Sequence, residues 1–538
     1  MASLLKYRTK KEKSKKSVVL EIECKNFRIV RFRFEKGDTN YDNMIKVLEF
    51  YMEPGVEDLF AFSFSYSKWK SKHLNGWEIY DPVLEFHRLG IRNEPMNETQ
   101  NRYSQKWRIT NFNHGNKVIQ SYPKYLVVPA SEDDNSLKKK LWLRKDNCIP
   151  VLSWIHPNSG AAILRSSQPT PLHQHKQSDT EYLVSIKKVS LNNLRIYDLR
   201  TKTAAQITKS PISGEEDEAE GGIKSLTFLD LSDSETLLHS ISIICEAIYS
   251  HFDQSTFWQK IVESGWLDIQ SKLLFSANMI IKVVDELNES VLLYCCDGSN
   301  QTPLLLSTVL LMLDPYYRTI KGFIILIEKE WISYGHKFSS NFNSQQPFFL
   351  SWMDATYQLL VQNPCAFEFN HNFLIYLMDE LFSCRFGTFI YDSDYERNEH
   401  NLSQKTISIW SSVLDPNRMS SFTNPFYQLH PKKMVAQFEQ GNLKLWEYFI
   451  RYTSMDCKEN PVQEAITPET KAQQLMDHNL KLQKQIQVLE KQLANASTAI
   501  IKSTSTSKIT NPRISRGSPH KIGFKRNTSQ RLLESDKT

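Results

Sequence analysis

Cys295 stands where an apolar stretch gives way to a short polar loop, which is a position from which a thiol can act as a nucleophile. Residues 291–294 (VLLY) are typical of a buried strand, residues 297–301 (DGSNQ) are polar, and residues 303–313 (PLLLSTVLLML) are long and apolar enough for a helix. The start of such a helix presents unpaired N–H groups and a positive dipole end to the loop. Because these groups also favour a thiolate, the stretch predicts an anion-binding loop that begins with an ionisable cysteine.

Five segments around this loop together resemble one protein family, the myotubularins, which are 3-phosphoinositide phosphatases of the cysteine-phosphatase superfamily. The active members carry HCSDGWDRT where this chain has YCCDGSNQT. The resemblance implies an α/β, protein tyrosine phosphatase-like fold, in which helices flank a central, largely parallel sheet and the loop follows a strand's C-terminal end. The segments are 294–302 (YCCDGSNQT), 311–314 (LMLD), 316–323 (YYRTIKGF), 149–157 (IPVLSWIHP) and 165–169 (RSSQP).

The resemblance places Cys295 at the nucleophile position but leaves the other two catalytic positions changed. The family's phosphate-clamping arginine is replaced by Gln301, and the aspartate thought to act as the general acid is replaced by Asn300. A glutamine amide lacks the charge and the two-pronged geometry that an arginine offers to a phosphate, and an asparagine amide cannot deliver a proton. We therefore predict that Cys295 is inherited from an enzyme and is no longer used in catalysis.

Other loop residues keep the family's identity and are expected to contact a phosphate or the substrate headgroup. These are Asp297, Gly298 and Thr302, together with Lys337, which matches a basic residue that contacts the headgroup in relatives.

Two alternatives for Cys295 stay open at this point. The cysteine is either a buried structural thiol, as many cysteines in strands are, or still a nucleophile with Gln301 and Arg318 in place of the arginine. The second is disfavoured because Arg318 lies about 24 Å farther along the helix at 1.5 Å per residue.

The remaining chain divides into segments of distinct composition. Residues 18–34 alternate between apolar and polar side chains as two strands, and a helix is expected near residues 44–51. This part resembles the second half of the family's PH-GRAM module. The expected organisation is a basic disordered N-terminus (1–17), a partial PH-GRAM-like segment (18–70), a myotubularin phosphatase-like domain (75–455), a coiled coil (470–497) and a disordered, basic, Ser/Thr-rich tail (498–538).

A heptad pattern over residues 470–497 predicts the coiled coil. Leucines recur at one core position, and the second core position holds an asparagine, which favours one register and a defined partner. We favour a dimerising coiled coil over a lone amphipathic helix, with an active relative or a second copy of the chain as the partner. The core residues are Leu475, Asn479, Leu482, Ile486, Leu489 and Leu493.

Composition limits the remaining function classes. The 538 residues contain no apolar run of about 18 residues that would span a membrane and no signal-peptide pattern, so we expect a cytoplasmic protein whose membrane contact is peripheral. The resemblance to the myotubularins implies that this membrane is endosomal. The eight cysteines are scattered without metal-ligand spacing, so we expect neither a metal nor another cofactor. The net charge of +6 is small for this length, and no nucleic-acid partner is expected.

The leading functional hypothesis is a myotubularin-type pseudophosphatase. It would pair with an active relative and regulate the turnover of phosphatidylinositol 3-phosphate and phosphatidylinositol 3,5-bisphosphate. The alternatives are an active phosphatidylinositol-3-phosphatase with a degenerate loop and a phosphoinositide-binding scaffold.

Overall fold

The computed structural model describes most of the chain as far as residue 452. It covers residues 4–11, 17–52, 55–63, 75–92, 106–170, 176–190, 193–207, 226–250, 253–341, 344–429 and 433–452. The predicted coiled coil (470–497) and tail (498–538) lie outside the described residues, and both stay predictions.

A five-stranded sheet in the order β6-β7-β10-β8-β9 lies at the centre of the large domain. Strand β10 pairs in parallel with β7 and β8, and β8 with β9, whereas β6 is antiparallel to β7. The residues of β6, β7 and β10 are all buried, which is why these strands do not alternate between apolar and polar residues. The predicted, largely parallel sheet is confirmed. The strands are β6 (Val151–Ile155), β7 (Ala162–Ser167), β8 (Leu194–Asp198), β9 (Thr227–Phe228) and β10 (Ser290–Cys295).

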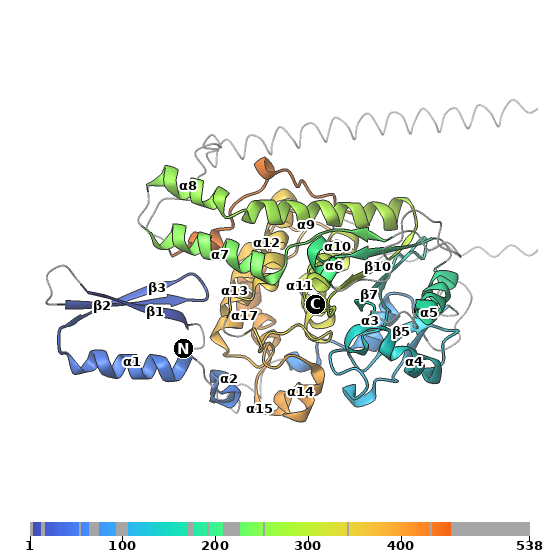
Figure 1. Cartoon of the computed structure of the whole chain (residues 1–538), viewed down its shortest axis with the longest axis horizontal. Helices are drawn as coiled ribbons and strands as arrows, with labels where there is room; N and C mark the ends of the chain where they lie inside the picture. The colour runs from blue at the N-terminus through green and yellow to red at the C-terminus, as the bar shows by residue number, and fades with distance from the viewer. Residues whose placement is uncertain are drawn as a thin grey trace, which may run out of the picture. The chain divides into compact units, whose positions relative to one another are not determined.

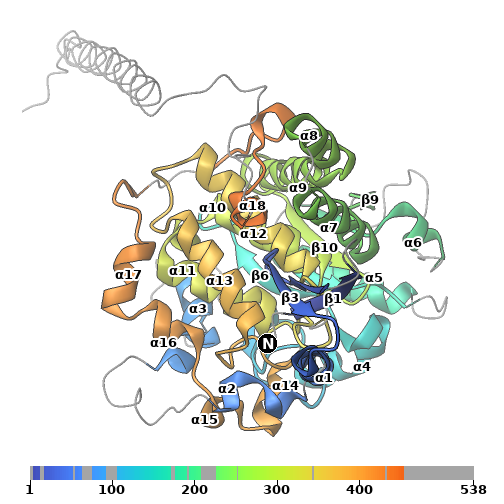
Figure 2. The ribbon, with the colours of Figure 1, turned by 90° about the vertical axis from the view of Figure 1, so that its left-hand side faces the viewer.

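Helix α10 (Gln301–Leu313) is the central helix, because all of its residues are buried. It contacts β10, α9 and α12, and Figure 2 shows α9 and α12 next to it. A helix with no side facing solvent is apolar all round, as the sequence of α10 is.

The other described helices surround the sheet and α10, and a two-stranded antiparallel ribbon of β4 (Trp107–Thr110) and β5 (Leu126–Pro129) adds to the large domain (Figure 1). No described helix combines the length and apolarity that crossing a bilayer requires. The helices are α2 (Phe60–Ser63), α3 (Pro82–Arg88), α4 (Asp134–Lys140), α5 (Lys176–Val189), α6 (Lys202–Ile207), α7 (Ser234–Tyr249), α8 (Gln254–Glu263), α9 (Trp266–Ile281), α11 (Ile320–Ile327), α12 (Pro347–Gln362), α13 (His371–Ser383), α14 (Asp394–Glu399), α15 (Leu402–Lys405), α16 (Ile409–Val413), α17 (Pro416–Phe422) and α18 (Glu447–Ile450).

The N-terminal residues form a three-stranded antiparallel sheet with a helix along one face (Figure 1). Leu20 and Ile22 of the middle strand and Leu48 of the helix form its small core. The two predicted strands and the predicted helix are confirmed, and the helix begins five residues earlier than expected. Its identity as part of a PH-GRAM module stays a prediction. The elements are β1 (Leu4–Lys11), β2 (Ser17–Cys24), β3 (Ile29–Glu35) and α1 (Thr39–Met52).

Strand β1 corrects the expectation that residues 1–17 are disordered, because residues 4–11 pair with β2 over its length. Tyr7 lies opposite Ile22 in this pairing and packs against the small core. The Lys6 ammonium lies 3.0 Å from the carboxylate of Glu23, whose side chain is buried. The basic charge that suggested disorder is thus partly offset by an acidic residue of the neighbouring strand. Backbone pairing with β2 provides the remaining stabilisation.

The boundary expected at residue 70 lies outside the described residues, but the chain already contacts the large domain before it. Leu59 and Ala61 pack in a cluster with Ile390 and Leu402 of the large domain rather than with the N-terminal sheet. The Ala61 N–H donates to the carbonyl of Cys384 over 2.9 Å. The large domain therefore begins to receive contacts from the chain about ten residues before the expected boundary.

The turn between β2 and β3 attaches the N-terminal unit to the end of the large domain. Phe27 adopts a positive φ of 65° and is 1% exposed. Its ring centroid lies 5.7 Å from that of Tyr448 and 4.9 Å from that of Phe449. Beside it, the Asn26 side chain donates to the Asp379 carboxylate over 3.0 Å.

We expect Phe27→Ala to lower the free energy of unfolding by about 3 to 5 kcal/mol, because it removes a buried aromatic side chain and leaves a cavity against two rings. Urea denaturation would measure the change. The matched control is Phe50→Ala, since Phe50 is 66% exposed. Equal losses of stability in the two variants would show that the turn does not hold the units together.

Candidate active-site loop and adjoining cavity

The predicted strand, loop and helix are present in the expected order. Strand β10 ends at Cys295, residues 296–300 form the loop, and α10 begins at Gln301. Because β10 is parallel to both of its neighbours, the loop emerges at the C-terminal edge of the sheet. The N-terminus of a buried helix faces the loop there, as an anion-binding site requires.

The loop conformation is fixed from β7 and from the segment after α11. Gly298 has a φ of +79°, and a Cβ at this position would lie 3.0 Å from the carbonyl of Ser166, so the backbone leaves little room for another residue. The Arg165 guanidinium donates to the Gly298 carbonyl over 2.6 Å. On the other side, Nδ1 of His336 lies 2.8 Å from the Ser299 carbonyl, so the imidazole donates to it.

Cys295 is 1% exposed, and burial is the main reason that the pKa of its thiol is raised. The nearby Asp297 carboxylate raises the pKa further, whereas the nearby Thr302 hydroxyl and the Asn300 backbone lower it. The net shift is upward, so the thiol is protonated at neutral pH. A cysteine phosphatase uses the thiolate, and burial and the Asp297 carboxylate both disfavour that form of Cys295.

The Gln301 side chain turns to the segment that follows β9 instead of clamping the loop. Its amide nitrogen donates to the Leu231 carbonyl over 2.9 Å and to the Ser232 carbonyl over 3.2 Å. The Leu231 N–H in turn donates to the Leu199 carbonyl just after β8. The residue at the arginine position thus serves as a structural link between α10 and the edge of the sheet.

Asn300, at the expected acid position, is the N-cap residue of α10 but makes no side-chain cap hydrogen bond. Its Oδ1 atom is buried without a hydrogen-bond partner among the described residues. Thr302 is fully buried, and its hydroxyl has no hydrogen-bond partner at ordinary distance among the described residues, although its proximity lowers the pKa of the Cys295 thiol.

Three other arginines near the loop could take the place of the family's arginine, but each is already paired with a carboxylate. The Tyr294 ring centroid lies 5.9 Å and 5.8 Å from the guanidinium carbons of Arg144 and Arg200. Arg318 follows the C-terminal end of α10, at a helix length of about 20 Å from the loop. The pairs, each with a buried carboxylate, are Arg144 with Asp179, Arg165 with Glu330, and Arg200 with Asp198.

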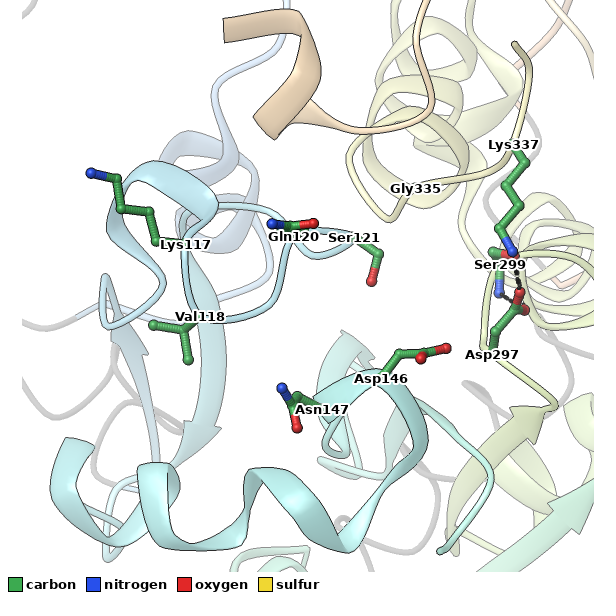
Figure 3. A pocket seen from close by; sticks show the side chains of 10 residues that line it. All are labelled: Lys117, Val118, Gln120, Ser121, Asp146, Asn147, Asp297, Ser299, Gly335 and Lys337. Atoms are coloured by element: carbon green, nitrogen blue, oxygen red, sulfur yellow. Dashed lines mark hydrogen bonds and ion pairs between the residues drawn. The ribbon is translucent and has the colours of Figure 1, made fainter. Parts of the chain in front are cut away.

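A cavity of about 570 Å³ adjoins the loop (Figure 3). Among the predicted site residues, Asp297 and Lys337 line it, whereas Cys295, Asn300, Gln301, Gly298 and Thr302 do not. The other lining residues come mainly from two segments that the sequence did not connect with the loop. They are Lys117, Val118, Gln120, Ser121, Asp146, Asn147, Ser299 and Gly335.

Asp297 and Lys337 form an ion pair of 3.0 Å at the mouth of this cavity (Figure 3). Burial opposes ionisation of Asp297, but hydrogen bonds from Ser299 and the charge of Lys337 outweigh it, so the pKa of the carboxyl is lowered. Burial likewise opposes the charge on Lys337, yet Asp297 raises the pKa of the ammonium overall. Both groups are therefore charged at neutral pH, and a phosphate bound here would compete with Asp297 for the lysine.

Three residues that shape the site were missed by the sequence analysis as site residues. Arg165 lies within the buried strand β7, and a charged residue in such a strand is the signal that would have marked it. His336 directly precedes Lys337 but carries no distinguishing pattern. Lys145, whose ammonium lies 3.1 Å from the Cys296 sulfur, is about 150 residues away in sequence and gave no signal. No group of three or more His, Cys, Asp or Glu side chains in the described ranges is arranged to hold a metal ion.

Comparisons with known proteins match the geometry of this domain. Residues 59–398 match the family model described as a myotubularin-like phosphatase domain. Myotubularin of Xenopus laevis is 34% identical over 457 residues, which cover 82% of this chain and 73% of the relative. The phosphatidylinositol-3,5-bisphosphate 3-phosphatase MTMR2 of Gallus gallus is 33% identical over 495 residues, which cover 89% of this chain and 83% of the relative.

The raised pKa of Cys295 leads to a prediction about its reactivity. We expect iodoacetamide to alkylate the exposed Cys296 well before Cys295 at pH 7, and the alkylation of Cys295 to increase with pH, because its raised pKa leaves less of the thiol ionised. Peptide mass spectrometry at timed intervals would give both rates. Rapid alkylation of Cys295 at pH 6 would contradict this picture of the loop.

Proposed function

The chain belongs to the myotubularin family, and we propose that it is a pseudophosphatase that binds an active relative and regulates 3-phosphoinositide turnover. The substrate class is that of the relative MTMR2, a phosphatidylinositol-3,5-bisphosphate 3-phosphatase. The site of action is the cytoplasmic face of endosomal membranes, reached by peripheral binding.

The contact of Gln301 carries this proposal. Its amide donates to the carbonyls of Leu231 and Ser232, so it neither bears the charge of the family's arginine nor points its donors into the loop. Loss of an arginine that stabilises a phosphoryl-transfer transition state costs about 10³ to 10⁵ in rate. Loss of a general acid, as at Asn300, costs about 10² to 10⁴. The two losses act on one transition state and need not multiply, but either leaves little turnover.

A phosphoinositide-binding scaffold is a second candidate, supported by the cavity beside the loop. Lys337 lines it and is half exposed, and the loop backbone is held by Arg165 and His336. Such a site binds a headgroup without cleaving it. The ion pair with Asp297 weakens this binding, because the phosphate must displace a carboxylate.

Pairing with a relative rests on the heptad pattern of residues 470–497. This segment lies outside the described residues, so its support is the spacing of its leucines in the sequence.

A phosphate-release assay on phosphatidylinositol 3-phosphate vesicles tests the catalytic part of the proposal. We expect the purified wild-type chain and Cys295→Ser to release phosphate at the same background rate, because the clamp and the acid are both absent. The Asn300→Asp, Gln301→Arg double variant is expected to gain turnover that Cys295→Ser abolishes.

Turnover by the wild-type chain that depends on Cys295 would overturn the proposal in favour of an active phosphatase with a degenerate loop. If the double variant releases no phosphate, further differences from the family motif also prevent catalysis. Examples are Tyr294 in place of the histidine and Ser299 in place of the tryptophan.

Leu482→Pro tests the pairing. We expect it to abolish co-purification with a myotubularin partner, because proline removes a backbone hydrogen bond in the middle of the predicted heptads. Ser503→Pro, in the tail beyond the coiled coil, is the control and should leave pairing intact. Unchanged pairing of Leu482→Pro would place the interface elsewhere.

A further inference from the structure

Trp142 exposes 42% of its surface, although tryptophans are usually well buried. It is the middle residue of a short 3-10 helix, η5 (Leu141–Leu143), whose last residue is buried. The Thr170 hydroxyl donates to the carbonyls of Trp142 and Leu143 over 3.1 Å and 3.2 Å. The backbone of the helix is thus anchored while the indole remains accessible to solvent.

Trp142 lies at the same edge of the sheet as the Cys295 loop. Strand β7 is parallel to β10, and its last residue, Ser167, lies beside Cys295. Thr170 follows three residues later and therefore lies beyond the edge at which the loop emerges. Its hydrogen bond to the Trp142 carbonyl places η5 at that edge.

Lysines flank the exposed indole. Helix α4 ends in Lys138, Lys139 and Lys140, of which Lys140 is paired with Glu132. Lys138 and Lys139 are exposed, and neither lies within salt-bridge distance of a carboxylate in the described part of the chain. Residues 133–146 contain five basic and three acidic residues, but Lys140 and Arg144 are paired with Glu132 and Asp179, so the exposed positive charge of this segment is mainly that of Lys138 and Lys139.

The same segment continues directly into the wall of the cavity. Asp146 and Asn147 follow four and five residues after Trp142 and line the cavity together with Lys337 from the opposite side (Figure 3). The exposed Lys117 also lines it. Trp142, Lys138 and Lys139 therefore belong to the segment that leads into the cavity wall at this edge of the sheet.

We propose that Trp142, Lys138 and Lys139 form a membrane-contact surface for anionic lipid. The indole inserts at the level of the headgroups, where an apolar ring with a polar N–H is favoured, and the two ammonium groups contact lipid phosphates or carboxylates. This orientation presents the cavity to the bilayer. The inference deepens the proposed function, because it assumes that the cavity faces lipid.

Flotation of the full chain with vesicles of phosphatidylcholine and phosphatidylserine, without phosphoinositide, tests this surface. We expect Trp142→Ala to lower the vesicle partition coefficient about fivefold or more, from the loss of interfacial aromatic area. Trp142→Phe should retain part of the binding. The Lys138→Gln, Lys139→Gln double variant should lower partition about tenfold or more, because each lysine near an anionic surface contributes roughly 0.7 log unit, or about fivefold. Binding should weaken as salt is raised.

Phe426→Ala is the matched control, because Phe426 is 72% exposed and lies in another segment. It should leave vesicle binding unchanged. A second measurement distinguishes a loss of membrane insertion from misfolding or damage to the cavity. In calorimetry, the binding of soluble inositol 1,3-bisphosphate should be the same in the wild-type chain and in Trp142→Ala.

Absence of vesicle binding by the wild-type chain, unchanged binding by Trp142→Ala, or an equal loss in Phe426→Ala would overturn the membrane-contact surface. None of these results bears on phosphate release. Conversely, Cys295-dependent turnover would overturn the proposed pseudophosphatase and leave this surface intact, so the two failures are distinguishable.

Discussion

The buried ion pair between Arg165 and Glu330 is the interaction on which the site depends. Both side chains are at most 1% exposed and lie 2.8 Å apart. The guanidinium also donates to the carbonyls of Glu330 and Gly298 and lies 4.0 Å from the centroid of the Tyr334 ring. Removal of one partner of a buried pair typically costs about 3 to 5 kcal/mol, because it leaves an uncompensated buried charge. This pair therefore ties β7, the segment after α11 and the active-site loop into one rigid arrangement.

This arrangement gives the loop the backbone geometry of an anion-binding site, whereas its side-chain charges are not suited to a phosphate. Gly298 has a positive φ, and the N-terminus of α10 lies at the loop. The charges that would hold a phosphate are missing at Gln301 or neutralised, as Lys337 is by Asp297. The residues that fix the loop backbone, Arg165 and His336, are not the residues at the family's catalytic positions. The loop geometry therefore does not depend on the side chains at positions 300 and 301.

The N-terminal unit is held by contacts that are unusual for an independent domain. Its sheet has a core of only a few side chains, and a turn residue, Phe27, is buried against the end of the large domain. Glu23, on the opposite face of β2, is buried, and its charge raises the pKa of Cys245 and of Tyr249 in α7. A three-stranded sheet with one helix gains stability when a larger domain covers its second face. Together these contacts explain how a short unit is stable here.

The sequence by itself determined the strand, loop and helix around Cys295, the parallel sheet, and the identity of the residues at the arginine and acid positions. These follow from local apolar runs and from a motif of nine consecutive residues. It did not predict strand β1, because the lysines of residues 4–11 suggest disorder until Glu23 is placed beside Lys6. Nor did it predict that Gln301 turns to Leu231 and Ser232, that Arg165 holds Gly298, or that Lys145 approaches Cys296. Those contacts join residues about 70, 130 and 150 positions apart. Only the tertiary structure decides them, because hydrophobic periodicity specifies which face of an element is buried, but not which distant polar group it meets there.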